Sequence, residues 1–392
     1  MSNNSVRILR IRYEDVPMYK EKNFEFNFMA TDRVSDPTQV FHVYKNIYTQ
    51  KMISLVGINA SGKTTALKLI HLAMSIVLDN TSLNEQSLYG REFLANGASV
   101  IINFYYKEKF YELKSIIRVK YSEDMERIHW YFSDEWVYCK DASAVRSKKD
   151  ALMPGKLVYQ RSTMNEEVKS VIKDDDSIII TITRDNTTGL HQMFPYTDVN
   201  VLTASGNLPA EALHVFDSNL DVLRIIKTEN APASYQVKMK DWEEGIELHN
   251  PLSLCNMISS GTIKGQNLIY HIKRILKSGG YIIVDELENH FNKELVRMIT
   301  NIFKNERINK KGACLIFTTH YVELLDFVDR KDNIFIARKA PDNLSSLEIL
   351  NYAKEVKRND VKKSEVILSN YIQGTAPRYE YIQALEDSLC VD

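Results

Sequence analysis

The segment Gly57–Thr64 has the glycine, lysine and threonine spacing of a loop that binds nucleotide phosphates. It reads Gly-Ile-Asn-Ala-Ser-Gly-Lys-Thr and fits the pattern G-x-x-x-x-G-K-[ST]. Glycines let backbone N–H groups approach phosphates closely, and the free N–H groups at a helix start favour negative charge. The apolar run 52–56 predicts a buried strand before the loop, and residues 65–72 predict a helix after it. The sequence therefore predicts strand, phosphate loop and helix in the order that this chemistry requires.

The side chains of this loop have expected contacts. Lys63 is expected to reach the β- and γ-phosphates, and the Thr64 hydroxyl is expected to ligate Mg²⁺. A chance match is disfavoured because the chain has only 14 glycines in 392 residues. The residues expected to bind the nucleotide are Gly57, Asn59, Ala60, Ser61, Gly62, Lys63, Thr64 and Thr65.

A second motif, Asp285-Glu286, follows the apolar run 281–284. A fully apolar run of this length predicts a strand buried on both faces, and ligands collect at the carboxyl ends of such strands. Asp285 is expected to hold Mg²⁺, directly or through water, and Glu286 to orient and deprotonate the attacking water. A strand that ends in Asp-Glu is weak support alone, but it becomes specific beside a phosphate loop.

Two further motifs complete the set. His320 follows the apolar run 313–317 and two threonines, about 35 residues after Glu286. A lone histidine after a strand is usually structural, but this is the place of the switch histidine of ABC-type ATPases, and the resemblance implies that His320 contacts the γ-phosphate and the attacking water. The turn Ser259-Ser260-Gly261 stands before an expected helix over 265–277, where its N–H groups could bind phosphate. A turn of this kind can also serve only as a helix cap.

In this order, the motifs resemble those of ABC-type ATPases rather than those of GTPases, kinases or ring-forming ATPases. Within that superfamily, Gly57–Thr64, Ser259–Thr262 and Asp285–Phe291 resemble the RecF/SMC/OLD-related group of AAA-family ATP-binding proteins. The likeness is greatest to the stand-alone ATPases of prokaryotic abortive-infection and antiphage systems, including the ATPase subunit of PARIS-like systems. Phe216–Leu220 and Tyr371–Gly374 also look like that group, so the likeness spans most of the chain.

The sequence also departs from this group. The group usually has a Leu-His-Pro-like stretch after its acidic motif, where this chain has Phe291-Asn292-Lys293. A role carried by that histidine in the family therefore has no counterpart here. For the Q-loop glutamine, Gln86 is a candidate only because of its position between the first helix and the next strands.

The resemblance implies an α/β, ABC-ATPase-like P-loop nucleotide-binding fold that binds ATP with Mg²⁺ and hydrolyses it to ADP and phosphate. It implies a homodimer, or a larger homo-oligomer, with two ATP molecules at the interface between subunits. Hydrolysis would then release a closed state that the γ-phosphate stabilises. Each site would combine Lys63, Thr64, Asp285, Glu286 and His320 of one subunit with Ser259, Ser260 and Gly261 of the other.

Three functions compete for such a fold. The first is a cytoplasmic switch ATPase, the sensor or regulatory subunit of an antiphage defence system that acts through a separate nuclease-like or toxin-like effector. The second is a DNA-repair or chromosome-maintenance ATPase like RecF or an SMC head, and the third is the ATP-binding subunit of a transporter. The first is favoured because about 70 residues after His320 are too few for an obvious nuclease domain, and because neither a basic groove nor a long heptad repeat is visible.

Composition is typical of a soluble, enzyme-sized chain. Its 50 basic and 51 acidic residues give no global charge to attract nucleic acid or an anionic membrane, which leaves nucleic acid open as a partner without indicating it. No apolar run approaches the roughly 18 residues of a membrane span. The four cysteines lack C-x-x-C spacing, which favours thiols in a reducing cytoplasm.

The pattern predicts three regions. Residues 1–145 are expected to form a first ATPase lobe with the phosphate loop and an antiparallel β layer. Residues 146–235 are expected to be an inserted or lid-like region outside the central sheet, and 236–392 a second lobe with the other motifs. The aromatic residues of 104–106 and 130–132 favour a packed sheet face over a base-stacking platform. The expected strands of the β layer are Val6–Ile11, Asn23–Phe28, Ala98–Tyr106, Phe110–Val119, Arg127–Tyr138 and Ser177–Ile182.

Overall fold

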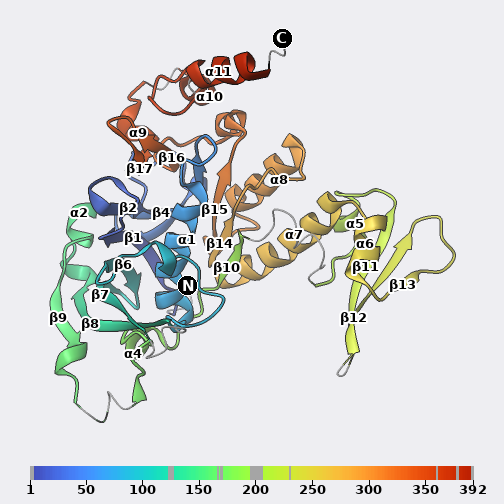
Figure 1. The fold of residues 1–392 in the computed structure, drawn as a ribbon. Helices are drawn as coiled ribbons and strands as arrows, with labels where there is room; N and C mark the ends of the chain where they lie inside the picture. The colour runs from blue at the N-terminus through green and yellow to red at the C-terminus, as the bar shows by residue number, and fades with distance from the viewer. Residues whose placement is uncertain are drawn as a thin grey trace.

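The computed structural model contains a central mixed sheet, a large antiparallel sheet and a smaller projecting unit (Figure 1). It describes residues 4–121, 128–165, 167, 171–194, 206–228, 231–358, 361–376 and 379–389. The expected mixed α/β class is confirmed. Among the described residues, none of the helices has the length and apolar character needed to cross a membrane.

The central sheet has the strand order β10-β14-β15-β5-β16-β17. Its first five strands are parallel, and β17 pairs with β16 in the antiparallel direction. The carboxyl ends of β5, β15 and β14 therefore meet at one edge of the sheet. The strands are β5 (Met52–Val56), β10 (Leu190–Met193), β14 (Tyr281–Val284), β15 (Cys314–Thr319), β16 (Ile334–Ala340) and β17 (Asn343–Asn351).

Helices cover both faces of this sheet. Because alternate strand residues point to opposite faces, Ile53 packs in the same core as helix α1 (Lys63–Met74), whereas Met52 packs with α7 (Ser260–Ser278) and α8 (Lys293–Lys304). A π-helical turn, Ser75–Asp79, extends α1. The buried runs predicted at 52–56, 281–284 and 313–317 are thus confirmed as central strands, and the helices predicted after the phosphate loop and at 265–277 are confirmed as α1 and α7.

The antiparallel sheet has the order β2-β1-β6-β7-β8-β9 and shares the core that contains α1. Phe104 and Tyr106 are fully buried and Phe132 is nearly so, which confirms the expected packed sheet face. Five of the six strands expected here are confirmed, although Arg127 lies outside the described residues. The strands are β1 (Arg7–Glu14), β2 (Asn23–Asn27), β6 (Ser99–Tyr106), β7 (Lys109–Tyr121), β8 (Ile128–Asp141) and β9 (Lys156–Gln160).

The strand expected at Ser177–Ile182 is wrong. This segment turns into the short helix α4 (Ile180–Thr183). The cause is the buried carboxylate of Glu135, which accepts hydrogen bonds from the Ser177 hydroxyl (2.6 Å) and from the Ile178 N–H (2.8 Å). These bonds hold the backbone against β8 without a strand ladder, and Ile178 and Ile179 are buried in succession.

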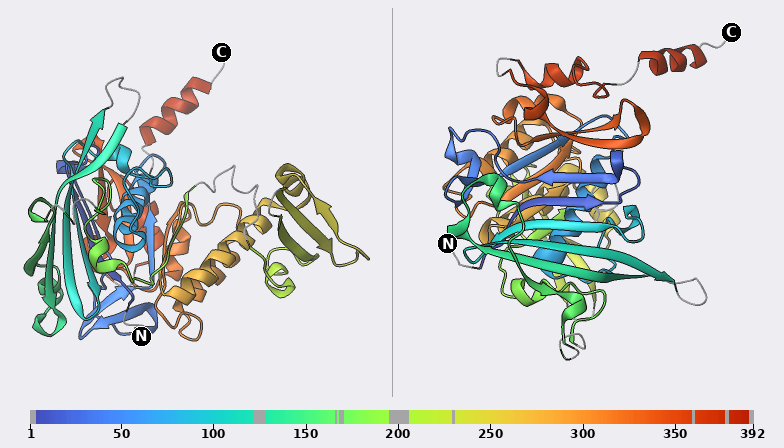
Figure 2. Two further views of the ribbon diagram at one scale, coloured as in Figure 1. Left: turned by 90° about the horizontal axis from the view of Figure 1, so that it is seen from below. Right: turned by 90° about the vertical axis from the view of Figure 1, so that its left-hand side faces the viewer.

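The stretch 146–235 is divided among three places in the structure. β9 extends the antiparallel sheet, and β10 is an edge strand of the central sheet, which differs from the expectation that this stretch lies outside it. The segment that contains α4 packs with the antiparallel sheet, and residues 206–228 and 231–235 belong to a unit at the end of α7, away from the central sheet (Figures 1 and 2). This projecting unit has its own small core. Its elements are α5 (Ala210–Leu213), β11 (Leu220–Thr228), β12 (Ala231–Met239), β13 (Ile246–Leu248) and α6 (Pro251–Met257).

The remaining elements are short. The hairpin β3–β4 lies beside the start of β5, and α2 follows the antiparallel sheet. After β17, the described residues form three helices, of which α11 extends away from the central sheet (Figures 1 and 2). These elements are α2 (Lys148–Ala151), β3 (Val40–Tyr44), β4 (Ile47–Gln50), α9 (Tyr352–Glu355), α10 (Lys363–Leu368) and α11 (Tyr379–Leu389). Short 3₁₀ turns occur at 20–22, 37–39, 91–93, 142–144, 161–163 and 322–327.

Candidate functional site

The loop 57–62 joins β5 directly to α1 at the carboxyl edge of the central sheet. Gly57 has no room for a side chain, because a Cβ there would lie 2.2 Å from the carbonyl oxygen of Ala337 on β16. Gly62 has a φ of +90°, a conformation that favours glycine. Asn59 and Ala60 are exposed at the tip of the loop, whereas Ser61 is buried. The loop therefore packs against β16, and the tip of the loop is exposed to solvent.

Lys63 and Thr64 begin α1, and Thr65 follows half-buried in the same turn. The Lys63 ammonium turns back into the loop and donates to the carbonyl oxygens of Gly57 (2.9 Å) and Ile58 (3.0 Å). Burial lowers the pKa of Lys63 from its ordinary value, and the nearby carboxylates oppose that effect. Lys63 is therefore a poorly solvated cation held inside the loop by two neutral carbonyls.

Asp285 directly follows β14 and links it to two neighbouring elements. Its Oδ2 accepts a hydrogen bond from the Thr64 hydroxyl of α1 (2.7 Å), and its Oδ1 accepts one from the Thr318 hydroxyl of β15 (2.6 Å). The carboxylate is almost buried, with 6% of the residue exposed. Asp285 and Thr64 thus place a carboxylate and a hydroxyl oxygen side by side.

His320 lies between Lys63 and Glu286, because β15 lies between β5 and β14 in the sheet. Its Nδ1 is 3.5 Å from the Lys63 ammonium, and its Nε2 is 3.4 Å from Oε1 of Glu286. The side chains of His320 and Glu286 are each 33% exposed. The imidazole therefore bridges the lysine of the loop and the second carboxylate of the Asp-Glu pair.

The turn Ser259–Gly261 packs against the loop that follows β14. Ser259 is the N-cap of α7, and its hydroxyl accepts a hydrogen bond from the Thr262 N–H (3.1 Å). The Ser260 hydroxyl lies 2.9 Å from Nδ1 of His290, and a Cβ on Gly261 would lie 2.6 Å from the His290 carbonyl oxygen. Within one chain, this turn thus contacts the far end of the loop 285–291. Lys63, Thr64, Asp285, Glu286 and His320 instead meet at the sheet edge.

Sequence reasoning missed four side chains around this site. Thr318 holds Asp285, as described above, and Oε1 of Glu288 accepts the backbone N–H of His320 (2.5 Å). Lys264 of α7 donates to carbonyls of the loop after β14, and His290 contacts Ser260. Thr318 and Glu288 could have been found from their positions beside His320 and Glu286, but Lys264 carries no motif. The Q-loop candidate, Gln86, is exposed in a turn between Ser75–Asp79 and the 3₁₀ turn at 91–93.

A cavity of about 920 Å³ opens beside the loop. Gly57, Ile58, Asn59 and His320 line one side, and residues 367–376 near the C-terminus line another. The cavity gives the His320 end of the site access to solvent and room for a ligand larger than water.

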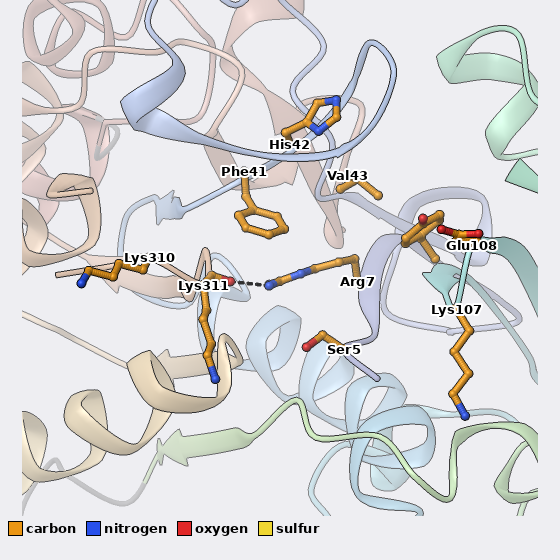
Figure 3. A pocket seen from close by; sticks show the side chains of 10 residues that line it. Ser5, Arg7, Phe41, His42, Val43, Lys107, Glu108, Lys310 and Lys311 are labelled. Atoms are coloured by element: carbon orange, nitrogen blue, oxygen red, sulfur yellow. Dashed lines mark hydrogen bonds between the residues drawn. The ribbon is translucent and has the colours of Figure 1, made fainter. Parts of the chain in front are cut away.

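A second cavity, of about 550 Å³, is built around Arg7 (Figure 3). The guanidinium of Arg7 lies against the Phe41 ring and donates to the carbonyl oxygens of Gly279 (2.7 Å), Gly312 (2.9 Å) and Lys311. These residues precede β14 and β15, so Arg7 holds the opposite edge of the central sheet from His320. Its donors serve the fold there.

A scan against protein-family models finds no matching family, and a search of curated proteins finds no match. The geometry of the site and the sequence motifs therefore form the basis of the functional argument below.

Proposed function

We propose that this chain binds ATP with Mg²⁺ and hydrolyses it to ADP and phosphate. The observation that carries the proposal is the convergence of Lys63 and Thr64 with Asp285, Glu286 and His320 at the carboxyl edge of one parallel sheet. These side chains come from three separate stretches of sequence. Their types match the needs of phosphoryl transfer, which are a cation for the phosphates, oxygen ligands for a metal ion and a base for water.

The loop and the start of α1 are suited to bind the triphosphate. Backbone N–H groups at a helix N-terminus attract phosphate, and the Lys63 ammonium can exchange its two carbonyl partners for phosphate oxygens. That exchange is favourable because a neutral carbonyl is replaced by a charged acceptor. The large cavity beside Asn59 and His320 leaves the γ-phosphate end of such a ligand accessible.

Thr64 and Asp285 fit a magnesium ion. They offer two adjacent oxygen donors, and Mg²⁺ is usually held by one or two carboxylates together with substrate phosphates and water. In the described part of the chain, no group of three or more His, Cys, Asp or Glu residues is placed to hold a metal ion. When bound, the ion neutralises charge on the phosphates and orients them.

Glu286 is placed to act as the base, with His320 beside it. In the proposed step, Glu286 takes a proton from water, the water oxygen forms a bond to the γ-phosphorus, and the bond between that phosphorus and the β–γ bridging oxygen breaks. ADP leaves with the electron pair of that bond. The imidazole of His320, between Lys63 and Glu286, can donate a hydrogen bond to the transferred group.

The larger assignment rests on the resemblance to ABC-type ATPases. In it, the chain has a P-loop nucleotide-binding fold, and Ser259–Gly261 of a second copy completes each site, so that ATP joins two subunits. The position of this turn at the N-terminus of the 19-residue helix α7 supports a phosphate-binding role. The resemblance further assigns the chain to antiphage or abortive-infection defence, as a cytoplasmic sensor or regulatory ATPase with a separate nuclease-like or toxin-like effector.

The test of ATP binding is the variant Lys63→Ala. We expect it to weaken ATP binding at least about 100-fold, the loss typical of a desolvated charged hydrogen-bonding group, while its circular dichroism spectrum is unchanged. Titration of a fluorescent ATP analogue in the presence of Mg²⁺ measures the affinity. Lys68→Ala is the matched control, because Lys68 lies on the same helix but pairs with Glu92. Retained ATP affinity in Lys63→Ala would refute the phosphate-loop assignment.

A further inference from the structure

Lys264 is a buried lysine outside the motifs discussed so far. It lies in the second turn of α7, and 0% of the residue is exposed. Burial lowers its pKa to about 8, although the nearby carboxylates of Glu288, Glu286 and Asp285 favour the charged form. Because a lysine is very rarely buried without compensating partners, its contacts call for an explanation.

In the described part of the chain, the side-chain hydrogen bonds of Lys264 go to the loop after β14. Its ammonium donates to the carbonyl oxygens of Glu286 (3.0 Å) and Asn289 (2.6 Å), and it lies 5.1 Å from the centre of the Phe291 ring. The two carbonyls belong to the first and last residues of one turn, since the Asn289 N–H also donates to the Glu286 carbonyl (3.0 Å). Lys264 therefore holds both ends of this turn from the neighbouring helix.

The backbone of Glu286 needs such support. Its φ of +48° lies in the left-handed region, which is uncommon for a residue other than glycine and costs free energy. The Thr318 hydroxyl accepts the Glu286 N–H (2.7 Å), and Lys264 binds the Glu286 carbonyl. Hydrogen bonds on both sides of the residue thus maintain a conformation that Glu286 would otherwise leave.

We infer that Lys264 is a positioning residue that fixes the backbone of Glu286 so that its carboxylate faces the attacking water. This inference rests on the proposed function, because it takes Glu286 as the base of hydrolysis. Lys264 lies one turn after Ser260 on α7, so the helix that carries the Ser259–Gly261 turn also holds the base of its own chain. Engagement of that turn by a second subunit would thereby act directly on the position of Glu286.

In the described part of the chain, none of the hydrogen bonds of Lys264 goes to the loop 57–62. Substitution of Lys264 should therefore not weaken ATP binding. Without the ammonium, the Glu286 carbonyl keeps the Asn289 N–H, and the residue can relax toward a negative φ. The carboxylate then turns away from the water. Loss of the ammonium should therefore lower kcat and leave the affinity for ATP unchanged.

Lys264→Met removes the charge and both hydrogen bonds while nearly keeping the side-chain length. We expect kcat for ATP hydrolysis to fall at least about tenfold, with KM and the Kd for ATP changed by less than about twofold, which is the signature of a lost transition-state interaction. Lys51→Met is the matched control. Lys51 is also buried, with 4% exposed, but it donates to the Thr38 carbonyl at the opposite end of β5. Both variants should be less stable than the wild-type chain, but only Lys264→Met should have a lower kcat for ATP hydrolysis.

The same substitution in a Glu286→Gln background separates positioning from a general structural effect. If Lys264 acts through Glu286, Lys264→Met should lower the residual single-turnover rate of Glu286→Gln by less than about twofold, because the effects of residues that act as a unit are not additive. A full tenfold loss in that background, or an unchanged kcat in Lys264→Met, would overturn the inference. If Lys264→Met does not fold, Lys264→Gln can still donate to one carbonyl and should give an intermediate kcat; wild-type kcat in that variant would also overturn it.

These experiments distinguish failure of the proposed ATPase function from failure of the proposed role of Lys264. A wild-type chain that binds no ATP and hydrolyses none would refute the ATPase proposal itself and with it the role of Glu286. A wild-type chain that hydrolyses ATP, combined with an unaffected Lys264→Met variant, would refute only the role of Lys264.

Discussion

Thr318 illustrates how single residues hold this site together. Its hydroxyl donates to Asp285 and accepts the N–H of Glu286, so one side chain of β15 fixes both residues of the Asp-Glu pair. Thr318 is fully buried. Water therefore cannot replace its hydroxyl if the hydroxyl is removed.

The variant Thr318→Val tests this role with a side chain of the same shape. It leaves the Glu286 N–H without its acceptor and Asp285 without one donor, which should cost about 1–3 kcal/mol of unfolding free energy. Because Asp285 then loses its orientation, we also expect the Mg²⁺ concentration for half-maximal ATPase activity to rise several-fold. A magnesium titration of the ATPase rate measures this change.

Thr300→Val is the control for Thr318→Val. Thr300 is also buried, but its hydroxyl bonds to the Arg297 carbonyl within α8. It should change stability without changing the magnesium dependence. An unchanged magnesium dependence in Thr318→Val would contradict the assignment of Asp285 as a metal ligand.

At the scale of elements, a pair of stacked histidines joins α7 to the edge of the central sheet. The rings of His191 on β10 and His271 on α7 lie 3.4 Å apart, centre to centre, at 12°. Burial, and then electrostatic interaction with His271, Arg274 and His71, lowers the pKa of His191 to about 3. Burial also lowers the pKa values of His271 and His71 to about 4. Both rings of the pair are therefore neutral in the folded chain at neutral pH.

These shifts predict a loss of stability in mild acid. The unfolded histidines bind protons near their ordinary pKa of 6.5, while the folded ones stay neutral until about pH 4, so the unfolding free energy falls as pH decreases through this window. Each such proton changes the unfolding free energy by at most about 1.4 kcal/mol per pH unit. Asp79 acts in the opposite direction, since burial raises its pKa to about 6.

Urea unfolding of His191→Asn between pH 7 and pH 5 isolates the contribution of the pair. We expect the variant to lose less unfolding free energy over this range than the wild-type chain. His249→Asn is the control, because the side chain of His249 is 78% exposed. Identical slopes for His191→Asn and the wild-type chain would contradict a neutral, half-buried His191.

The sequence predicts β5, β14 and β15, which are three of the six strands in the central sheet, and the reason is physical. The runs 281–284 and 313–317 are apolar, and 52–56 is apolar apart from the buried Ser54, because parallel strands buried on both faces need such runs. β10 was missed because its sequence, Leu-His-Gln-Met, places polar side chains at the sheet edge, where His191 finds a stacking partner. The strand expected at Ser177–Ile182 failed because its local pattern does not reveal the buried Glu135 that binds it.

The site is predictable from sequence only in part. Lys63, Thr64, Asp285, Glu286 and His320 stand in recognisable motifs, and the structure brings them together. Lys264 could not be found in this way, because a lysine in a helix usually lies in solvent and only the fold reveals its carbonyl partners. Residues that support a motif from another element leave no local pattern of their own.

At the scale of the whole molecule, α7 joins the site to the projecting unit (Figure 1). Gln266 of α7 donates to the carbonyl oxygens of Gly206 and Leu223, and Gly265 packs so closely on Phe216 that a Cβ there would lie 2.3 Å from its ring. The unit is therefore attached firmly to the helix that carries the Ser259–Gly261 turn. In the proposed dimer, a second subunit that contacts this turn would therefore also affect the position of the projecting unit.

The mass of Glu286→Gln in solution, with and without ATP and Mg²⁺, tests the central claim most directly. This variant keeps the phosphate-binding residues and removes the base, so ATP should persist and hold two subunits together. Size-exclusion chromatography with light scattering should then give about twice the 45.3 kDa of one chain with ATP, and a smaller mass in the same protein without ATP or carrying Lys63→Ala. A Glu286→Gln chain that hydrolyses ATP at the wild-type rate and has the same mass with and without ATP would contradict the account.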